Sequence, residues 1–186
     1  MNDTDIWLQW WAFAWRHAHP HWPTLDVLPA EERSAHASAS KTFGIAPCLP
    51  CPPTAALMQL ALAPPSHYDA LLQRVEHICR PRLPTALDAT QRLWCQRLAW
   101  ALRAQGWLEP ADDVLQLLRA WLTPPVWQRV RLRFAPDRVE ALEQQPLVKI
   151  APAKLQTLWQ AVLWHQHLVT DIPANELPRH ADTPHT

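Results

Sequence analysis

The chain has 186 residues, which is enough for one compact domain around a single core. Positive and negative side chains balance at 17 each, so the overall charge excludes a general attraction to nucleic acid or to anionic membranes. Charged residues make up only 18% of the chain, and 12 residues are tryptophan. Part of the apolar surface is therefore expected to be covered by protein partners.

The first amphipathic segment predicts a helix over residues 4–18, with Asp3 or Thr4 as its N-cap. Its large apolar positions recur with helical spacing at Trp7, Trp10, Trp11, Ala14 and Trp15. The apolar run is shorter than the roughly 20 residues that span a bilayer, and no basic region precedes it. We expect this helix to dock on the core of a cytoplasmic protein, with no direct membrane insertion.

Prolines break the chain after this helix. A short helix is expected over residues 29–38, where Pro29 suits the first helical position. Residues 39–53 contain Gly44 and four prolines, and this composition predicts a flexible Pro-rich linker. We expect the linker to be the most mobile internal segment.

The rest of the chain has the pattern of short helices, many of which start at a proline. Their expected positions are 54–63, 68–79 with Ser66 as the cap, 86–105 ended by Gly106, a helix opened by Pro110, one restarted by Pro124, 136–143 and 152–168. The predicted fold is therefore all-α, a single irregular bundle of short, proline-started helices over residues 1–169. Residues 170–186 are rich in Pro, His, Asp and Thr and predict a disordered C-terminal tail.

The densest basic run lies directly after the helix start at Thr123-Pro124, and we call residues 127–134 the basic run. It reads Trp127-Gln128-Arg129-Val130-Arg131-Leu132-Arg133-Phe134. Its strict alternation alone predicts a half-buried strand, whereas the preceding proline and the helical spacing of its large apolar residues favour a helix. We expect a helix.

Arginine and tryptophan dominate the energetic centres of protein interfaces. We therefore predict that a partner interface, or its support, is formed by Trp127, Arg129, Arg131, Arg133 and Phe134. Replacing Arg129 and Arg133 by Glu is expected to abolish partner capture without unfolding the protein. A solvated basic face is one alternative, and a helical nucleic-acid-binding protein is another.

The sequence lacks the common patterns of catalysis. Two glycines exclude the phosphate-binding loop and the dinucleotide fingerprint, which both need several residues without a Cβ. No serine lies in a Gly-x-Ser-x-Gly elbow. We expect no enzyme, no catalytic residue and no cofactor.

Cysteine and histidine spacing leaves a metal-binding alternative open. Cys48 and Cys51 form a Cys-x-x-Cys, and His17, His19 and His21 form a triplet, which together would supply a four-ligand zinc set. No second Cys-x-x-Cys follows, and the βαβ setting of a thioredoxin is missing. We expect no metal, with a small metal-binding protein as the alternative.

The C-terminal half contains a series of apolar and basic patterns in a fixed order. They are Leu93-Trp94, Leu98, the run Ala101-Leu102-Arg103-Ala104-Gln105-Gly106-Trp107, Leu117-Leu118, and the basic run after Val126. With these patterns the C-terminal half resembles the adaptor family of the type III secretion sorting platform, known as SctK or YscK-like, and especially its Hrp-type accessory members. The N-terminal aromatic helix closing on His19-Pro20, followed by Leu28-Pro29, is similar to the way such proteins begin.

The resemblance implies a non-enzymatic, mainly α-helical cytoplasmic adaptor, peripheral to the inner-membrane secretion apparatus. Its implied partners are the cytosolic domain of the inner-membrane ring protein and the pod protein that recruits the export ATPase complex, with no nucleic acid. No site residue of the family is carried over. The Cys-x-x-Cys and the histidine triplet are not part of the family pattern.

Overall fold

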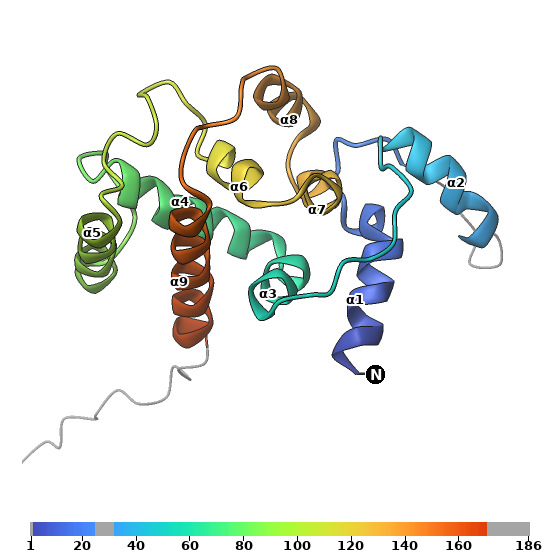
Figure 1. Ribbon diagram of the computed structural model, residues 1–186, viewed down its shortest axis with the longest axis horizontal. Coiled ribbons are helices and arrows are strands. Elements are labelled where there is room, and N and C mark those ends of the chain that lie inside the picture. Colours follow the sequence, from blue (N-terminus) through green and yellow to red (C-terminus); the bar gives the residue numbers. More distant parts are fainter. Residues whose placement is uncertain (1, 25–31, 171–186) are drawn as a thin grey trace, which may run out of the picture.

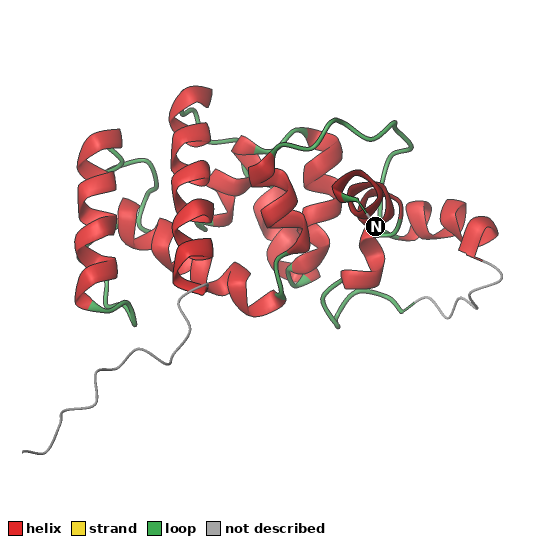
Figure 2. Cartoon of the chain, turned by 90° about the horizontal axis from the view of Figure 1, so that it is seen from below, coloured by secondary structure: helices red, strands yellow, loops and turns green. Residues whose placement is uncertain are grey.

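The computed structural model describes residues 2–24 and 32–170 (Figure 1). This part of the chain contains nine α-helices and no β-strand, which confirms the predicted all-α fold. The helices form an elongated, irregular bundle (Figure 2). One end of the long axis holds α5 (Ala89–Leu102), and the other holds α2 (Glu32–Thr42) (Figure 1).

The first helix, α1 (Asp3–Ala12), is shorter than predicted. Its N-cap is Asn2 rather than a later residue, since the Asn2 side chain accepts from the Asp5 N–H at 2.8 Å and the Asp5 carboxylate accepts from the Asn2 N–H. Phe13 leaves the helical conformation, and a short 3-10 turn, η1 (Ala14–His17), follows. Trp15 therefore lies on this turn and not on the same helix face as the three preceding indoles.

Those three indoles, Trp7, Trp10 and Trp11, are buried against one another and against the core. The ring centroids of Trp7 and Trp10 are 5.0 Å apart in a stacked arrangement. Burial of each ring stabilises the fold by about 1.5–3 kcal/mol. The expectation that this helix docks on its own core is thus met in the structure.

The helix α2 covers the first residues of the predicted linker. Pro29, the expected start of this helix, lies outside the described residues. Beyond the helix, Phe43 and Ile45 are buried with Leu132 in a small second cluster. Residues 39–42 of the predicted linker are therefore helical and Phe43 and Ile45 pack on the fold, while the mobility of the segment stays a prediction.

Two helices follow close to their predicted positions. The helix α3 (Ala55–Leu62) is capped by Thr54, whose hydroxyl accepts from the Leu57 N–H at 3.3 Å. The helix α4 (Pro65–Cys79) starts with its proline in the first turn, so Ser66 lies inside the helix and does not cap it.

The helix α5 is shorter than predicted at both ends. Asp88 caps it in a capping box with Gln91, so the residues before Asp88 are not helical. Arg103, and not Gly106, ends the helix in the left-handed region, with φ 53°. The predicted glycine terminator is therefore wrong by three positions, although Gly106 also has a positive φ of 81°.

The remaining elements are α6 (Leu115–Trp121), α7 (Pro124–Val130), the 3-10 turn η3 (Arg131–Arg133), α8 (Pro136–Glu143) and α9 (Pro152–Thr170). The basic run is thus α-helical to Val130 and 3-10 helical over Arg131–Arg133, whereas Phe134, predicted within the helix, is extended. Pro110 does not open α6, because it lies in a turn closed by the bond from the Asp112 N–H to the Glu109 carbonyl, and the Asp113 carboxylate then accepts from the Leu115 N–H before the helix begins. The tail predicted from residue 170 lies outside the described residues except for Thr170 itself.

The helix α9 lies at the centre of the bundle, against α3, α4, α5 and α6. Its inward side chains are Leu155, Leu158, Trp159, Val162 and Leu163, and all are buried. Trp159 stacks on Trp121 of α6, with 5.7 Å between ring centroids. Among the described helices, none combines the length and the apolar character that a membrane crossing needs.

Candidate functional site

The five residues predicted at an interface all belong to the α7–η3 segment and the residue after it. Trp127, Arg129 and Phe134 are 6%, 4% and 5% exposed, while Arg131 and Arg133 are half-buried. The basic run therefore faces the interior of the molecule more than the solvent.

Arg129 reaches the end of α1. Its Nε donates to the Trp11 carbonyl at 2.9 Å, its Nη1 donates to the Pro125 carbonyl at 2.8 Å, and its guanidinium lies 3.9 Å from the centre of the Trp11 ring. Burial lowers the pKa of Arg129, while the neighbouring Cys48 and Cys51 act to raise it. The last turn of α1 has no basic residue of its own, so Arg129 supplies a positive charge where the helix dipole is negative.

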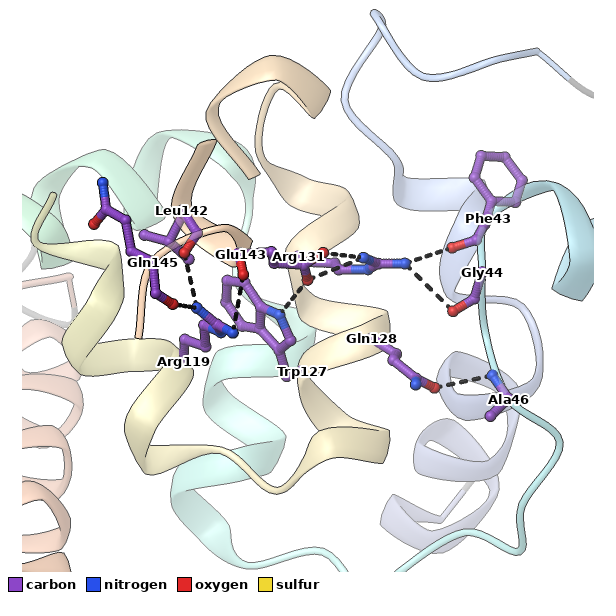
Figure 3. A network of polar contacts seen from close by, with 10 residues as sticks. All are labelled: Phe43, Gly44, Ala46, Arg119, Trp127, Gln128, Arg131, Leu142, Glu143 and Gln145. Atoms are coloured by element: carbon purple, nitrogen blue, oxygen red, sulfur yellow. Dashed lines mark hydrogen bonds and ion pairs between the residues drawn. The ribbon is translucent and has the colours of Figure 1, made fainter. Parts of the chain in front are cut away.

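Arg131 joins three parts of the chain (Figure 3). Its Nη1 donates to both carboxylate oxygens of Glu143 at 2.9 and 2.8 Å, and its Nη2 donates to the carbonyls of Phe43 and Gly44 at 2.9 and 3.3 Å. The same Glu143 accepts from Trp127 Nε1 at 2.7 Å. Gly44 has φ +61°, which favours glycine, and a Cβ there would lie 2.9 Å from Arg131 Nη2, so the guanidinium would have to shift.

Two further arginines bind helix ends in the same way. Arg133 Nη2 donates to the carbonyl of Ala61, in the last turn of α3, at 3.0 Å. Arg119 Nη1 donates to the carbonyls of Leu142 and Gln145, at the end of α8, at 2.8 and 2.9 Å (Figure 3). Neither α3 nor α8 has a basic residue in its last turn. Arginines from elsewhere in the fold thus satisfy the carbonyl ends of α1, α3 and α8.

The segment between α2 and α3 is tied down on one side by indoles. Trp7 Nε1 donates to the Cys51 carbonyl at 2.8 Å, and Trp11 Nε1 donates to the Cys48 carbonyl at 3.3 Å. On the other side, the Ala46 N–H donates to the Gln128 side chain at 2.9 Å (Figure 3). Helices α1 and α7 thus hold the non-helical part of residues 39–53 at several points, and the flexibility of this segment stays a prediction.

The burial of the basic run corrects one expectation directly. Arg129→Glu was expected to leave the fold intact, but a carboxylate at this buried position would face the Trp11 and Pro125 carbonyls. Such a change removes a partner from buried acceptors and adds an unpaired charge. A solvated basic face is also wrong for Arg129. For all five residues, a role in supporting a partner interface stays a prediction.

The alternative metal site is not assembled in the part of the chain that the structure describes. No group of three or more His, Cys, Asp or Glu side chains there is placed to hold a metal ion. Instead, Arg129 Nη1 donates to Cys48 Sγ at 3.8 Å, and a guanidinium beside a thiol disfavours a cation at the same place. Burial raises the pKa of Cys51, which further disfavours the thiolate form that binds zinc.

Large apolar side chains lie exposed in another part of the molecule. Trp100 on α5 is 79% exposed, Trp164 on α9 is 61% exposed, and Leu93 on α5 is 49% exposed. The sequence analysis did not single out these two indoles. The helical periodicity of α5 could have predicted the exposure of Trp100, because this residue lies on the opposite face from the buried Cys95 and Leu102.

Comparisons with family models, with curated proteins and with solved structures find no match for this chain. The likeness to type III secretion adaptors therefore rests on the sequence pattern alone.

Proposed function

We propose that this chain is a non-enzymatic adaptor that binds other proteins, and that it works in the sorting platform of a type III secretion apparatus. The observation that carries the proposal is the exposure of Trp100 and Trp164 on a bundle whose other large rings are mostly buried. Tryptophan is among the residues that dominate interface energetics, and large exposed apolar side chains mark contact surfaces.

The low charge of the chain supports the same conclusion. With only 18% charged residues and a formal net charge of zero, the protein has little electrostatic repulsion against association. Contact with another protein would bury the exposed indoles of this chain, so these indoles favour a complex over the free monomer.

The internal arginines support an adaptor in a different way. Arg129, Arg131 and Arg133 tie α1, the segment after α2, and α3 to the α7–η3 segment. An adaptor that bridges two partners has to hold its two binding surfaces at a fixed distance. Hydrogen bonds that join segments far apart in the sequence supply such rigidity.

The resemblance to SctK or YscK-like proteins supplies the setting and the partners. The proposed partners are the cytosolic domain of the inner-membrane ring protein and the pod protein of the sorting platform. The proposed location is the cytoplasmic face of the inner membrane, next to the secretion apparatus. The residues that carry the resemblance lie between Leu93 on α5 and Phe134 after η3, and Leu93 is the one among them that shares the outer face of α5 with Arg97 and Trp100.

Reconstitution from purified components tests this function. The full chain is mixed with the ring cytosolic domain, with the pod protein, and with both, and complexes are measured by size-exclusion chromatography with light scattering. We expect a complex with each partner and a ternary complex with both. If the folded chain binds neither protein at mild salt, the proposed function is refuted.

A further inference from the structure

The helix α5 is apolar on two opposite faces. Cys95, Ala99 and Leu102 point inward and are at most 7% exposed. Leu93 and Trp100 lie seven residues apart, which is two helical turns, and so share the opposite face. A helix that is apolar on both faces is ordinarily covered on both, yet this face is bare in the described chain.

The same face carries positive charge. Arg97 lies between Leu93 and Trp100 in the helical net, and it is exposed. Among the described residues, the side chains of Arg97 and of the exposed Arg103 have no hydrogen-bond or ion-pair partner. The helix itself contains no Asp or Glu.

The surrounding sequence increases this positive charge. Residues 89–106 hold three arginines, Arg92, Arg97 and Arg103, and no acidic residue, in a chain whose 17 basic and 17 acidic residues balance overall. Charge of one sign around an apolar ridge selects a partner surface of the opposite sign.

The shape of this region also suits a partner. The helix α5 lies at the end of the long axis, so no other described helix covers its outer side (Figure 2). At its C-terminal end a small hollow of about 200 Å³ is lined by Ala99, Trp100, Arg103 and Gln105. A convex helix with anchors at i, i+4 and i+7 fits a groove on another protein.

From these observations we propose that the outer face of α5 docks into an apolar groove with an acidic rim on a partner protein. Leu93 and Trp100 enter the groove, and Arg97 pairs with the acidic rim. The proposal deepens the proposed function by naming the surface that a partner takes, and it rests on that function only for the identity of the partner.

Site-specific crosslinking in the producing cell identifies what occupies this face. A photoreactive benzoylphenylalanine replaces Gln96, which is exposed on the same face but is not one of the anchors. The matched control carries the same group in place of Leu147, which is 53% exposed between α8 and α9. We expect one protein to be crosslinked from position 96 and not from position 147.

The partner identified by crosslinking is then purified on its own, and its affinity for variants of this chain tests the roles of Trp100 and Arg97. Trp100→Ala and Arg97→Glu are each expected to weaken binding at least about tenfold, since a central aromatic anchor and a rim charge are lost. Leu147→Ala is expected to leave the affinity unchanged. Circular dichroism melts of all three variants verify that the fold is retained.

The outcomes separate the two proposals. Crosslinking to the ring or pod protein, with weakened binding by both α5 variants, supports both. The same weakening with any other protein supports the docking face and refutes the secretion role. No crosslink above the position-147 control, a crosslink to a second copy of the chain, or binding that Arg97→Glu leaves intact overturns the docking proposal.

Discussion

Two regions of this molecule combine arginine with tryptophan, and they use the combination in opposite ways. In the basic run, Arg129 is 4% exposed and its guanidinium binds carbonyl groups at the end of α1. On α5, Arg97 and Trp100 are exposed, and their side chains make no hydrogen bond or ion pair in the described chain. The difference shows that a segment rich in arginine and tryptophan can have either of two roles. It braces the fold where its arginines meet unsatisfied carbonyl groups at helix ends, and it is a candidate interface where no such carbonyl groups lie within reach.

The largest expected effect comes from reversing the charge at one position of each kind. Arg129→Glu is expected to lower the free energy of unfolding by about 3–5 kcal/mol, because it buries an unpaired carboxylate and leaves the Trp11 carbonyl without its donor. Arg97→Glu is expected to change it by less than about 0.5 kcal/mol, as for other exposed substitutions. Urea denaturation followed by circular dichroism measures both.

If Arg129→Glu and Arg97→Glu lowered the free energy of unfolding equally, the basic run and the outer face of α5 would not differ in their contribution to the fold. In that case α5 would depend on Arg97 for its own packing. A small loss from Arg129→Glu would instead mean that the α1–α7 contact contributes little to the stability of the fold.

The next effect concerns the carboxylate at the centre of Figure 3. Glu143→Ala is expected to lower the free energy of unfolding by about 1–3 kcal/mol, since Trp127 and Arg131 both lose their acceptor. Glu140→Ala, on the exposed face of the same helix, is the matched control and is expected to have little effect. Thermal melts of both variants give the comparison, and equal melting temperatures would contradict a bracing role for Glu143.

Local signals in the sequence predicted most of the helices. Proline at a helix start fixed the beginning of α7, α8 and α9, because its ring sets φ and its missing N–H is not needed there. The periodicity of the apolar residues placed the buried face of α9 and the indoles of α1. These features depend on neighbours within a few residues.

The residues of the basic run were singled out from the sequence, but their bracing contacts were not predicted because they join distant segments. Nothing near Arg129 in the sequence indicates that its guanidinium meets the Trp11 carbonyl, 118 residues away. Charge and aromatic content alone made Arg129 look like a surface residue. The helix phase of Trp100 does predict its exposure, but only once the inward face of α5 is known from Cys95 and Leu102.

The ion pair of Arg138 and Asp113 is less buried than Arg129 and less exposed than Arg97, and its effect on stability is expected to be smaller and to depend on pH. Arg138 donates to the Asp113 carboxylate at 2.6 and 2.8 Å, and their side chains are 39% and 27% exposed. Burial acts to raise the pKa of Asp113, but the hydrogen bonds from Arg138 and the Leu115 N–H outweigh it, so the pKa is lowered. A lowered pKa makes the ionised form stabilising above about pH 3.9, the ordinary value, and this stability is lost as pH falls through the folded-state pKa.

The asparagine variant measures this contribution. Wild type is expected to exceed Asp113→Asn by about 0.5–1 kcal/mol in free energy of unfolding at pH 7, since a half-exposed ion pair is partly screened by solvent. The gap should narrow below pH 4. Urea denaturation at pH 7, 4 and 3 tests the trend, and a gap that is constant with pH would show that charge is not its origin.

The smallest expected effect concerns Arg103, the outward arginine at the end of α5. Its φ of 53° lies in the left-handed region, where a side chain with a Cβ is strained. Arg103→Gly is expected to raise the free energy of unfolding by about 0.5 kcal/mol, because relief of this strain exceeds the added flexibility of the unfolded chain.

Gly106→Ala is the matched opposite change, at φ 81° with no atom within 4 Å of the added Cβ, and should lower stability by about 1 kcal/mol through backbone strain alone. Differential scanning calorimetry resolves shifts of this size. A loss of stability in Arg103→Gly would mean that this guanidinium braces the fold as Arg129 does. A gain shows that the left-handed backbone at Arg103 lowers stability by more than any contact of its side chain within the folded chain adds.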